Sequence, residues 1–182
     1  MNWQQLQVLK PKQFRCGHCG FTVASDKGYP WQNSLRKLLI CPNCDRPAYF
    51  EEGLGQIPGQ APGNEVAHLP QNLEKLYREA RLCCSVSAYT ASVLASRKLL
   101  MNISVQQGAK EGLKFIEYVE YLATKGYIPP NGKGWVDHIR KKGNEATHEI
   151  ALMDSGDAEE LIAFSEMLLK FVYEFPSRVP TT

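Results

Sequence analysis

Cys16-Gly17-His18-Cys19 and Cys41-Pro42-Asn43-Cys44 are two C-x-x-C pairs separated by 21 residues. Each pair presents two thiolates from one tight turn, and two such turns complete the tetrahedral shell of soft ligands that Zn²⁺ prefers. The spacing fits the general layout of paired C-x-x-C zinc sites, with a slightly longer insert between the pairs. The sequence therefore predicts a zinc ribbon in which one structural Zn²⁺ is bound by Cys16, Cys19, Cys41 and Cys44.

Two other interpretations of these cysteines are weaker. They are four incidental cysteines or a redox C-x-x-C motif, and a redox motif occurs singly before a helix, whereas this chain has two pairs. A closed four-thiolate shell leaves no position open for water, so the metal is expected to stabilise the fold and not to catalyse. His18 is expected to be a bystander, and Gly20 to adopt the left-handed turn that aims backbone N–H groups at sulfur.

The pattern of the chain changes after the second cysteine pair. Residues 1–52 contain short apolar runs such as Leu38-Leu39-Ile40, which are typical of short strands around a metal. Residues 53–63 contain four glycines and two prolines, a composition that indicates an interdomain linker. The alternative, a phosphate-binding loop, is disfavoured because no Gly-Lys-Ser/Thr follows. We therefore expect a zinc ribbon over 1–52, a linker over 53–68 and a helical domain over 69–178.

Helical periodicity dominates from Pro70 onward, where apolar residues return every three or four positions. It predicts two helices between 70 and about 105 with a break near 85–87, and a third over 113–122 that Gly126 ends. A fourth is expected over 136–150, and a fifth after residue 156, capped by Asp157 and ended by Pro176. The expected fold class is mainly α: a five-helix antiparallel bundle preceded by a small β zinc ribbon.

Composition and charge exclude several classes of protein. The net charge is +2, and Lys and Arg outnumber Asp and Glu by 7 to 5 before residue 66 and equal them at 14 each after it. This balance is not that of a polybasic nucleic-acid binder, so any such contact needs a local patch. No apolar run is long enough for a membrane span or signal peptide, and the cysteine pattern is not a disulfide framework. We expect a cytoplasmic protein with no membrane partner.

The segment 135–148 places a polar stripe on the fourth expected helix. Arg140, Asn144 and His148 follow one another at intervals of four residues, so they share one face. Gly143 and Ala146 make the neighbouring face narrow. A cation, an amide and an imidazole in line indicate a polar site at a helix–helix or subunit contact, and a purely structural role for the His148 ring is the alternative.

At these residues the chain resembles the bacterial family catalogued as domain of unknown function 4145. The resemblance rests on Arg140, Gly143-Asn144 and Ala146-Thr147-His148, on the Leu76-Tyr77-Arg78-Glu79-Ala80 entry, on Arg97 and on the exit from Gly126 to Pro129. It extends from about Pro70 to Phe175, and zinc-ribbon fusions also occur in that family. The family looks like a member of the HEPN superfamily of helical bundles, many of which are metal-independent endoribonucleases of phage-defence and conflict systems.

The resemblance implies a chemistry and also shows departures from it. In active HEPN ribonucleases, a His moves the proton of the RNA 2′-OH and an Arg stabilises the phosphorane at a dimer interface. Here Arg140 and His148 have seven residues between them instead of four to six, and Met101 replaces a frequent acidic residue. A homodimer is the assembly that the resemblance implies.

Three functions are consistent with the sequence. The first is a non-catalytic module that binds an RNA or a protein partner in bacterial or phage defence and conflict systems. The second is a metal-independent endoribonuclease with Arg140, Asn144 and His148 as catalytic residues. The third is a structural adaptor. The polar stripe argues against the third and the near-neutral charge against strong, sequence-independent RNA binding, so we favour the first.

Overall fold

A computed structural model describes residues 3–31, 35–129, 134–135, 139 and 152–178. The chain divides into two compact units, residues 1–61 and residues 62–182. The first unit contains all the strands and the second all the helices of the described residues.

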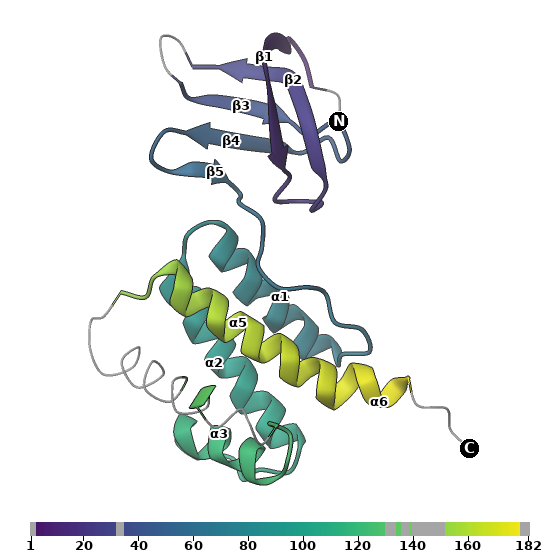
Figure 1. Ribbon diagram of the computed structural model, residues 1–182, viewed down its shortest axis with the longest axis vertical. Helices are drawn as coiled ribbons and strands as arrows, with labels where there is room; N and C mark the ends of the chain where they lie inside the picture. The colour runs from purple at the N-terminus through teal and green to yellow at the C-terminus, as the bar shows by residue number, and fades with distance from the viewer. Residues whose placement is uncertain (1–2, 32–34, 130–133, 136–138, 140–151, 179–182) are drawn as a thin grey trace. The chain divides into compact units, whose positions relative to one another are not determined.

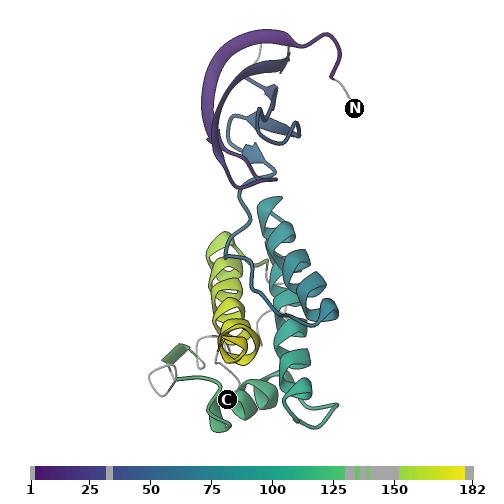
Figure 2. The same cartoon turned by 90° about the vertical axis from the view of Figure 1, so that its right-hand side faces the viewer.

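The N-terminal unit is one antiparallel sheet in which each strand pairs with the next along the chain (Figure 1). The strands are β1 (Gln7–Arg15), β2 (Thr22–Pro30), β3 (Lys37–Ile40), β4 (Pro47–Glu51) and β5 (Gly55–Ile57). The long strands β1 and β2 curve together (Figure 2), and their register shifts between Val8 and Lys12. This irregularity places extra residues on β1 and adds to its bend. β5 lies within the segment 53–68 that the composition indicates as a linker.

The core of the N-terminal unit is small and includes metal-ligand candidates. Phe14, Leu39, Ala48 and Phe50 are buried together with Cys16 and Cys41. The rings of Phe14 and Phe50 meet edge to face at 5.1 Å. Because a core of this size gives little stability by itself, the cysteine cluster and the sheet depend on each other.

The C-terminal unit is a set of packed helices. They are α1 (Gln71–Ser85), α2 (Tyr89–Gln106), α3 (Phe115–Thr124) and α5 (Ser155–Leu169), followed by a π-helical turn (Lys170–Glu174) and the short α6 (Phe175–Ser177). α2 packs against α1, α3 and α5, and α5 lies along both α1 and α2 (Figures 1 and 2). The largest fully buried side chains of this core include Leu99, Ile103, Leu122, Phe164 and Leu168.

The expectation of a mainly α, five-helix HEPN-like bundle is wrong. The described residues form four helices of ten or more residues, beside a sheet of five strands. The expected fourth helix, 136–150, falls almost entirely on residues outside the described ranges. The apolar period that predicted it, Val136, Ile139, Gly143, Ala146 and Ile150, includes a glycine, a residue type of low helix propensity, so the period was a weak reason to count a fifth helix.

The helix boundaries confirm part of the sequence interpretation. The predicted break near 85–87 is present, because α1 ends at Ser85 and α2 begins at Tyr89. Gly126 follows the end of α3 with a φ of 80°, the left-handed residue expected there. The predicted cap of the last long helix is wrong by three residues: Asp154 is the N-cap and accepts a hydrogen bond from the Asp157 N–H at 2.9 Å. Pro176 lies inside the short α6 and does not end the helical path.

Residues 62–67, which we name the strap, are bound to the helices they precede. Arg81 of α1 donates to the carbonyl oxygens of Pro62 (2.8 Å) and Gly63 (2.9 Å). Glu166 of α5 accepts from the Asn64 N–H at 2.8 Å and from the Asn64 amide at 3.0 Å. The strap therefore belongs to the helical unit, although its glycine and proline content is typical of a linker.

Among the described residues, no helix is both long and apolar enough to cross a membrane.

Candidate metal centre

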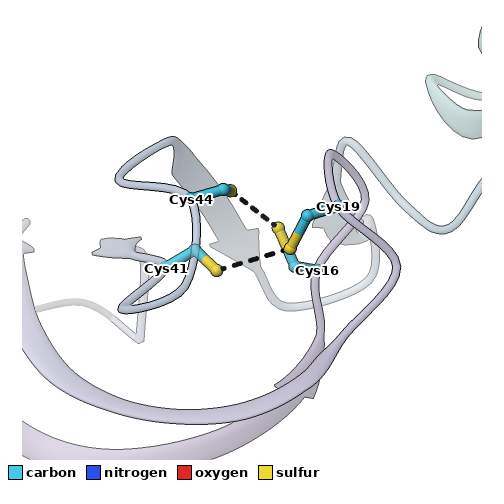
Figure 3. A group of neighbouring side chains, drawn as sticks. All are labelled: Cys16, Cys19, Cys41 and Cys44. Atoms are coloured by element: carbon cyan, nitrogen blue, oxygen red, sulfur yellow. Dashed lines mark hydrogen bonds between the residues drawn. The ribbon is translucent and has the colours of Figure 1, made fainter.

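Four cysteine sulfurs converge at one end of the sheet. The Sγ atoms of Cys16, Cys19, Cys41 and Cys44 all lie within 4.8 Å of one another, and they point toward a common centre (Figure 3). The Cys16–Cys44 and Cys19–Cys41 sulfur pairs are each 3.8 Å apart. A regular tetrahedron around Zn²⁺, with Zn–S bonds of about 2.3 Å, has sulfur–sulfur edges of about 3.8 Å. The arrangement is therefore compatible with a tetrahedral metal site.

The two turns that carry the cysteines have the same backbone hydrogen bonds. In the first, Cys16 N–H donates to the Phe21 carbonyl and Gly20 N–H donates to the Cys16 carbonyl, both at 2.9 Å. In the second, Cys41 N–H donates to the Arg46 carbonyl and Asp45 N–H donates to the Cys41 carbonyl, again at 2.9 Å. Each turn thus holds its cysteine pair with the same two backbone hydrogen bonds, and the pairs face each other as matched halves of one site (Figure 3).

The residue after each cysteine pair adopts a left-handed backbone. Gly20 has a φ of 74°, as its sequence position predicts, and Asp45 has a φ of 56° in the second turn. Aspartate is one of the few non-glycine residues that visit this region at modest cost. The Asp45 carbonyl also accepts the Trp3 indole N–H at 2.7 Å, which ties the N-terminal segment to the second turn.

N–H groups also point at the sulfurs. The His18 N–H lies 3.4 Å from the Cys16 sulfur, and the Asn43 amide nitrogen lies 3.5 Å from the Cys19 sulfur. Such contacts disperse the negative charge of metal thiolates and orient the ligands. The ring Nε2 of His18 is 3.0 Å from the Pro47 carbonyl oxygen, and the ring is not part of the sulfur cluster.

The thiol pKa values are spread by their surroundings. Burial is the main cause that raises the pKa of Cys44 to about 12, and the neighbouring thiols add to it. Burial also acts to raise the pKa of Cys19, but hydrogen bonds from the Phe21 N–H, from the Asn43 amide and from neighbouring thiols outweigh it and lower that pKa to about 6. Four thiolates this close repel one another, and a central divalent cation is the group that stabilises them together.

Asn43→Ala is expected to weaken metal binding without abolishing it. The substitution removes the amide that lies beside the Cys19 sulfur but keeps all four cysteines. Loss of one such supporting contact reduces metal affinity by about 10-fold in comparable sites. Competition with a chromogenic chelator measures the affinity, and Asn102→Ala, which changes an asparagine on α2, is the matched control. Equal affinities for the two variants would show that the Asn43 amide does not support the site.

The sequence also predicts a second, catalytic site and a set of family motif residues in the helical unit. Arg140, Asn144 and His148 lie outside the described residues, so their roles stay a prediction. Arg97, singled out in the family resemblance, is described: it is buried on α2, and its guanidinium lies over the Phe115 ring at 4.4 Å from the ring centroid. Tyr77 and Ala80 of the entry motif are buried on α1, so these motif residues pack the core.

A family model described as "Domain of unknown function (DUF4145)" matches residues 78–181, more than half of the chain. The chain belongs to this family. Neither a curated protein nor a solved structure matches it. The DUF4145 match begins within α1 and ends in the last residues of the chain, so the cysteine cluster lies in the part that precedes it. The match establishes DUF4145 membership and carries no statement about a HEPN-like fold or a nuclease.

Proposed function

We propose that the cysteine cluster binds one structural Zn²⁺, and that the N-terminal unit is a non-catalytic recognition module joined to a DUF4145 helical domain. In this function the module binds a nucleic-acid or protein partner, and the metal holds the recognition surface in shape.

One observation carries the proposal: four cysteine sulfurs lie within 4.8 Å of one another on two matched turns. Soft thiolates select zinc or an iron–sulfur cluster over hard cations, and separations of 3.8 Å between sulfurs suit a single small ion. Four protein ligands also fill the tetrahedral shell, so neither water nor substrate has a position on the metal. A closed shell supports a structural ion and not a catalytic one.

The proposal is tested on the purified full-length chain. Elemental analysis is expected to find one zinc per chain that survives extensive dialysis, and an apo sample prepared with chelator is expected to lose partner capture in parallel. A chain that purifies with iron and the absorption of an iron–sulfur cluster would contradict the zinc assignment. Partner capture that is unchanged after zinc removal would contradict the recognition role.

The remaining parts of the function rest on the family resemblance. A homodimeric assembly and a place in bacterial or phage defence are proposals of this kind. The endoribonuclease alternative stays a prediction, and comparing wild type with His148→Ala on total RNA under chelator tests it. Cleavage by the wild type alone, leaving 2′,3′-cyclic phosphate ends, would support that alternative.

A further inference from the structure

The positive charge of the N-terminal unit is concentrated at its beginning. Residues 1–25 contain Lys10, Lys12 and Arg15 and no Asp or Glu, whereas residues 26–61 contain four basic and four acidic residues. All three basic side chains are exposed. The whole cationic surplus of this unit therefore lies on β1 and at the entry to the first cysteine turn.

β1 is an edge strand, which pairs only with β2 in the described sheet. Pro11 and the register shift between Val8 and Lys12 make this edge a poor template for another strand. Lysines on an edge strand also discourage strand pairing, so their presence alone does not indicate a ligand. Protection of the strand edge does not explain a second feature of the same region, the exposed ring of Phe21.

Phe21 is an aromatic residue with 62% of its surface exposed, directly after the first cysteine turn. Its carbonyl accepts the Cys16 N–H at 2.9 Å, so its backbone is part of the rigid turn. Arg15 lies beside it, because the Arg15 Nε donates to the Gly20 carbonyl at 2.9 Å. An exposed ring on a hydrogen-bonded backbone, with a guanidinium hydrogen-bonded to the residue before it, is suited to stacking on a flat group that carries a negative charge.

Lys10 and Lys12 are too far from Cys16 along β1 for their charge to act only on the metal centre. Arg15 is adjacent to Cys16 and is able to balance the charge of about −2 on a zinc tetrathiolate. Lys12 precedes Cys16 by four residues and Lys10 by six, which on an extended strand corresponds to about 13 Å and about 20 Å. Both distances exceed the screening length of about 8 Å at physiological salt. The Lys12 ammonium also lies over the Phe50 ring, 5.0 Å from the ring centroid, but both lysines are exposed, so their charge is available to an extended polyanion.

We propose that β1 and the first cysteine turn form a single-stranded nucleic-acid binding surface, in which Phe21 stacks on a base and Lys10, Lys12 and Arg15 contact the phosphates. The inference rests on the proposed recognition function and names its partner class. A single strand fits because its bases are free to stack on an isolated ring, whereas those of a duplex are paired and covered.

Fluorescence anisotropy with labelled oligouridylate and oligothymidylate tests the proposal on the zinc-loaded full-length chain. The wild type is expected to bind, with the logarithm of the affinity falling against the logarithm of salt with a slope of about −2, as three phosphate contacts require. Phe21→Ala is expected to weaken binding roughly 10-fold. The triple variant Lys10→Gln, Lys12→Gln, Arg15→Gln is expected to lose most of the salt dependence.

A charge-matched control separates this surface from general attraction. Lys75→Gln, Arg78→Gln and Lys110→Gln remove the same charge from exposed positions of the helical unit and are expected to leave binding unchanged. The proposal would be overturned if the two triple variants lost affinity equally, or if the wild type failed to bind at low salt. It would also be overturned if the chain preferred a duplex, or if Phe21 captured a protein in place of nucleic acid. Zinc content is measured for every variant, so failure to bind nucleic acid with one zinc retained refutes this surface and leaves the structural metal intact.

Discussion

In a Cys41→Ser variant, the N-terminal unit is expected to lose its metal ion and to unfold. Cys41 is fully buried, and its sulfur lies 3.8 Å from that of Cys19. A hydroxyl is a poor replacement for a thiolate on zinc, and structural zinc contributes about 10–16 kcal/mol of apparent binding free energy in comparable small sites. Elemental analysis measures the metal, and amide hydrogen exchange over residues 3–31 and 35–61 measures the fold.

Cys83→Ser provides the matched control for this prediction. Cys83 lies on α1 in the helical unit, is partly exposed and is not a member of the sulfur cluster. This variant is expected to keep its zinc and the exchange protection of the sheet. Full zinc content in Cys41→Ser, or equal zinc loss in both variants, would refute the assignment of Cys41 as a ligand.

The sequence was most informative where chemistry restricts the choice of residues. Two C-x-x-C pairs have few structural explanations, so the cysteine cluster was predictable in full, as was the left-handed Gly20. The left-handed backbone at the equivalent position of the second turn was not predicted, because an aspartate such as Asp45 does not indicate a positive φ as a glycine does. The position in the sequence could have predicted it, because Gly20 and Asp45 each follow the second cysteine of a pair.

The extent of the sheet was much less predictable. Six of the nine residues of β2 are polar, glycine or proline, and β1 has only one buried residue, Phe14. Neither strand shows the alternation of apolar and polar residues that identifies a half-buried strand. These strands form because each pairs with a neighbour and because the cysteine turn joins them. Such pairing does not produce a recognisable pattern of residues within either strand.

The helices were predicted in position better than in detail. Leu73, Tyr77, Ala80 and Cys84 recur on one face and are buried as expected. The π-helical turn at Lys170–Glu174 was not foreseen, since the apolar period does not distinguish one π-helical turn from the α-helix that it follows. The same holds for the strap, whose glycine and proline content indicates a linker although its backbone groups are bound by charged side chains of the helices.

Glu166→Ala is expected to release the strap and lower the stability of the helical unit by about 2 kcal/mol. The Glu166 carboxylate accepts two hydrogen bonds from Asn64 and pairs with Lys170, while its side chain is only 13% exposed. Hydrogen bonds to charged groups contribute about 1.5–3 kcal/mol, and the exposure of Asn64 and the partial exposure of Lys170 reduce their sum. Thermal unfolding and hydrogen exchange at the Asn64 amide measure the two effects. Glu159→Ala, an exposed acidic position on the same helix, is the matched control.

The same carboxylate makes the strap sensitive to acid. Burial acts to raise the pKa of Glu166, but hydrogen bonds from Lys170 and Asn64 outweigh it and hold that pKa below its ordinary value. A carboxyl whose pKa is lowered by folding stabilises the fold above its unfolded pKa of about 4.3, and that contribution is lost as the pH falls through the folded-state value. Protection of the Asn64 amide is therefore expected to fall below about pH 4 in the wild type. In Glu166→Gln, which keeps an acceptor but cannot ionise, protection is expected to be lower at neutral pH and independent of pH in this range. An equally steep acid loss in that variant would show that another group controls the strap.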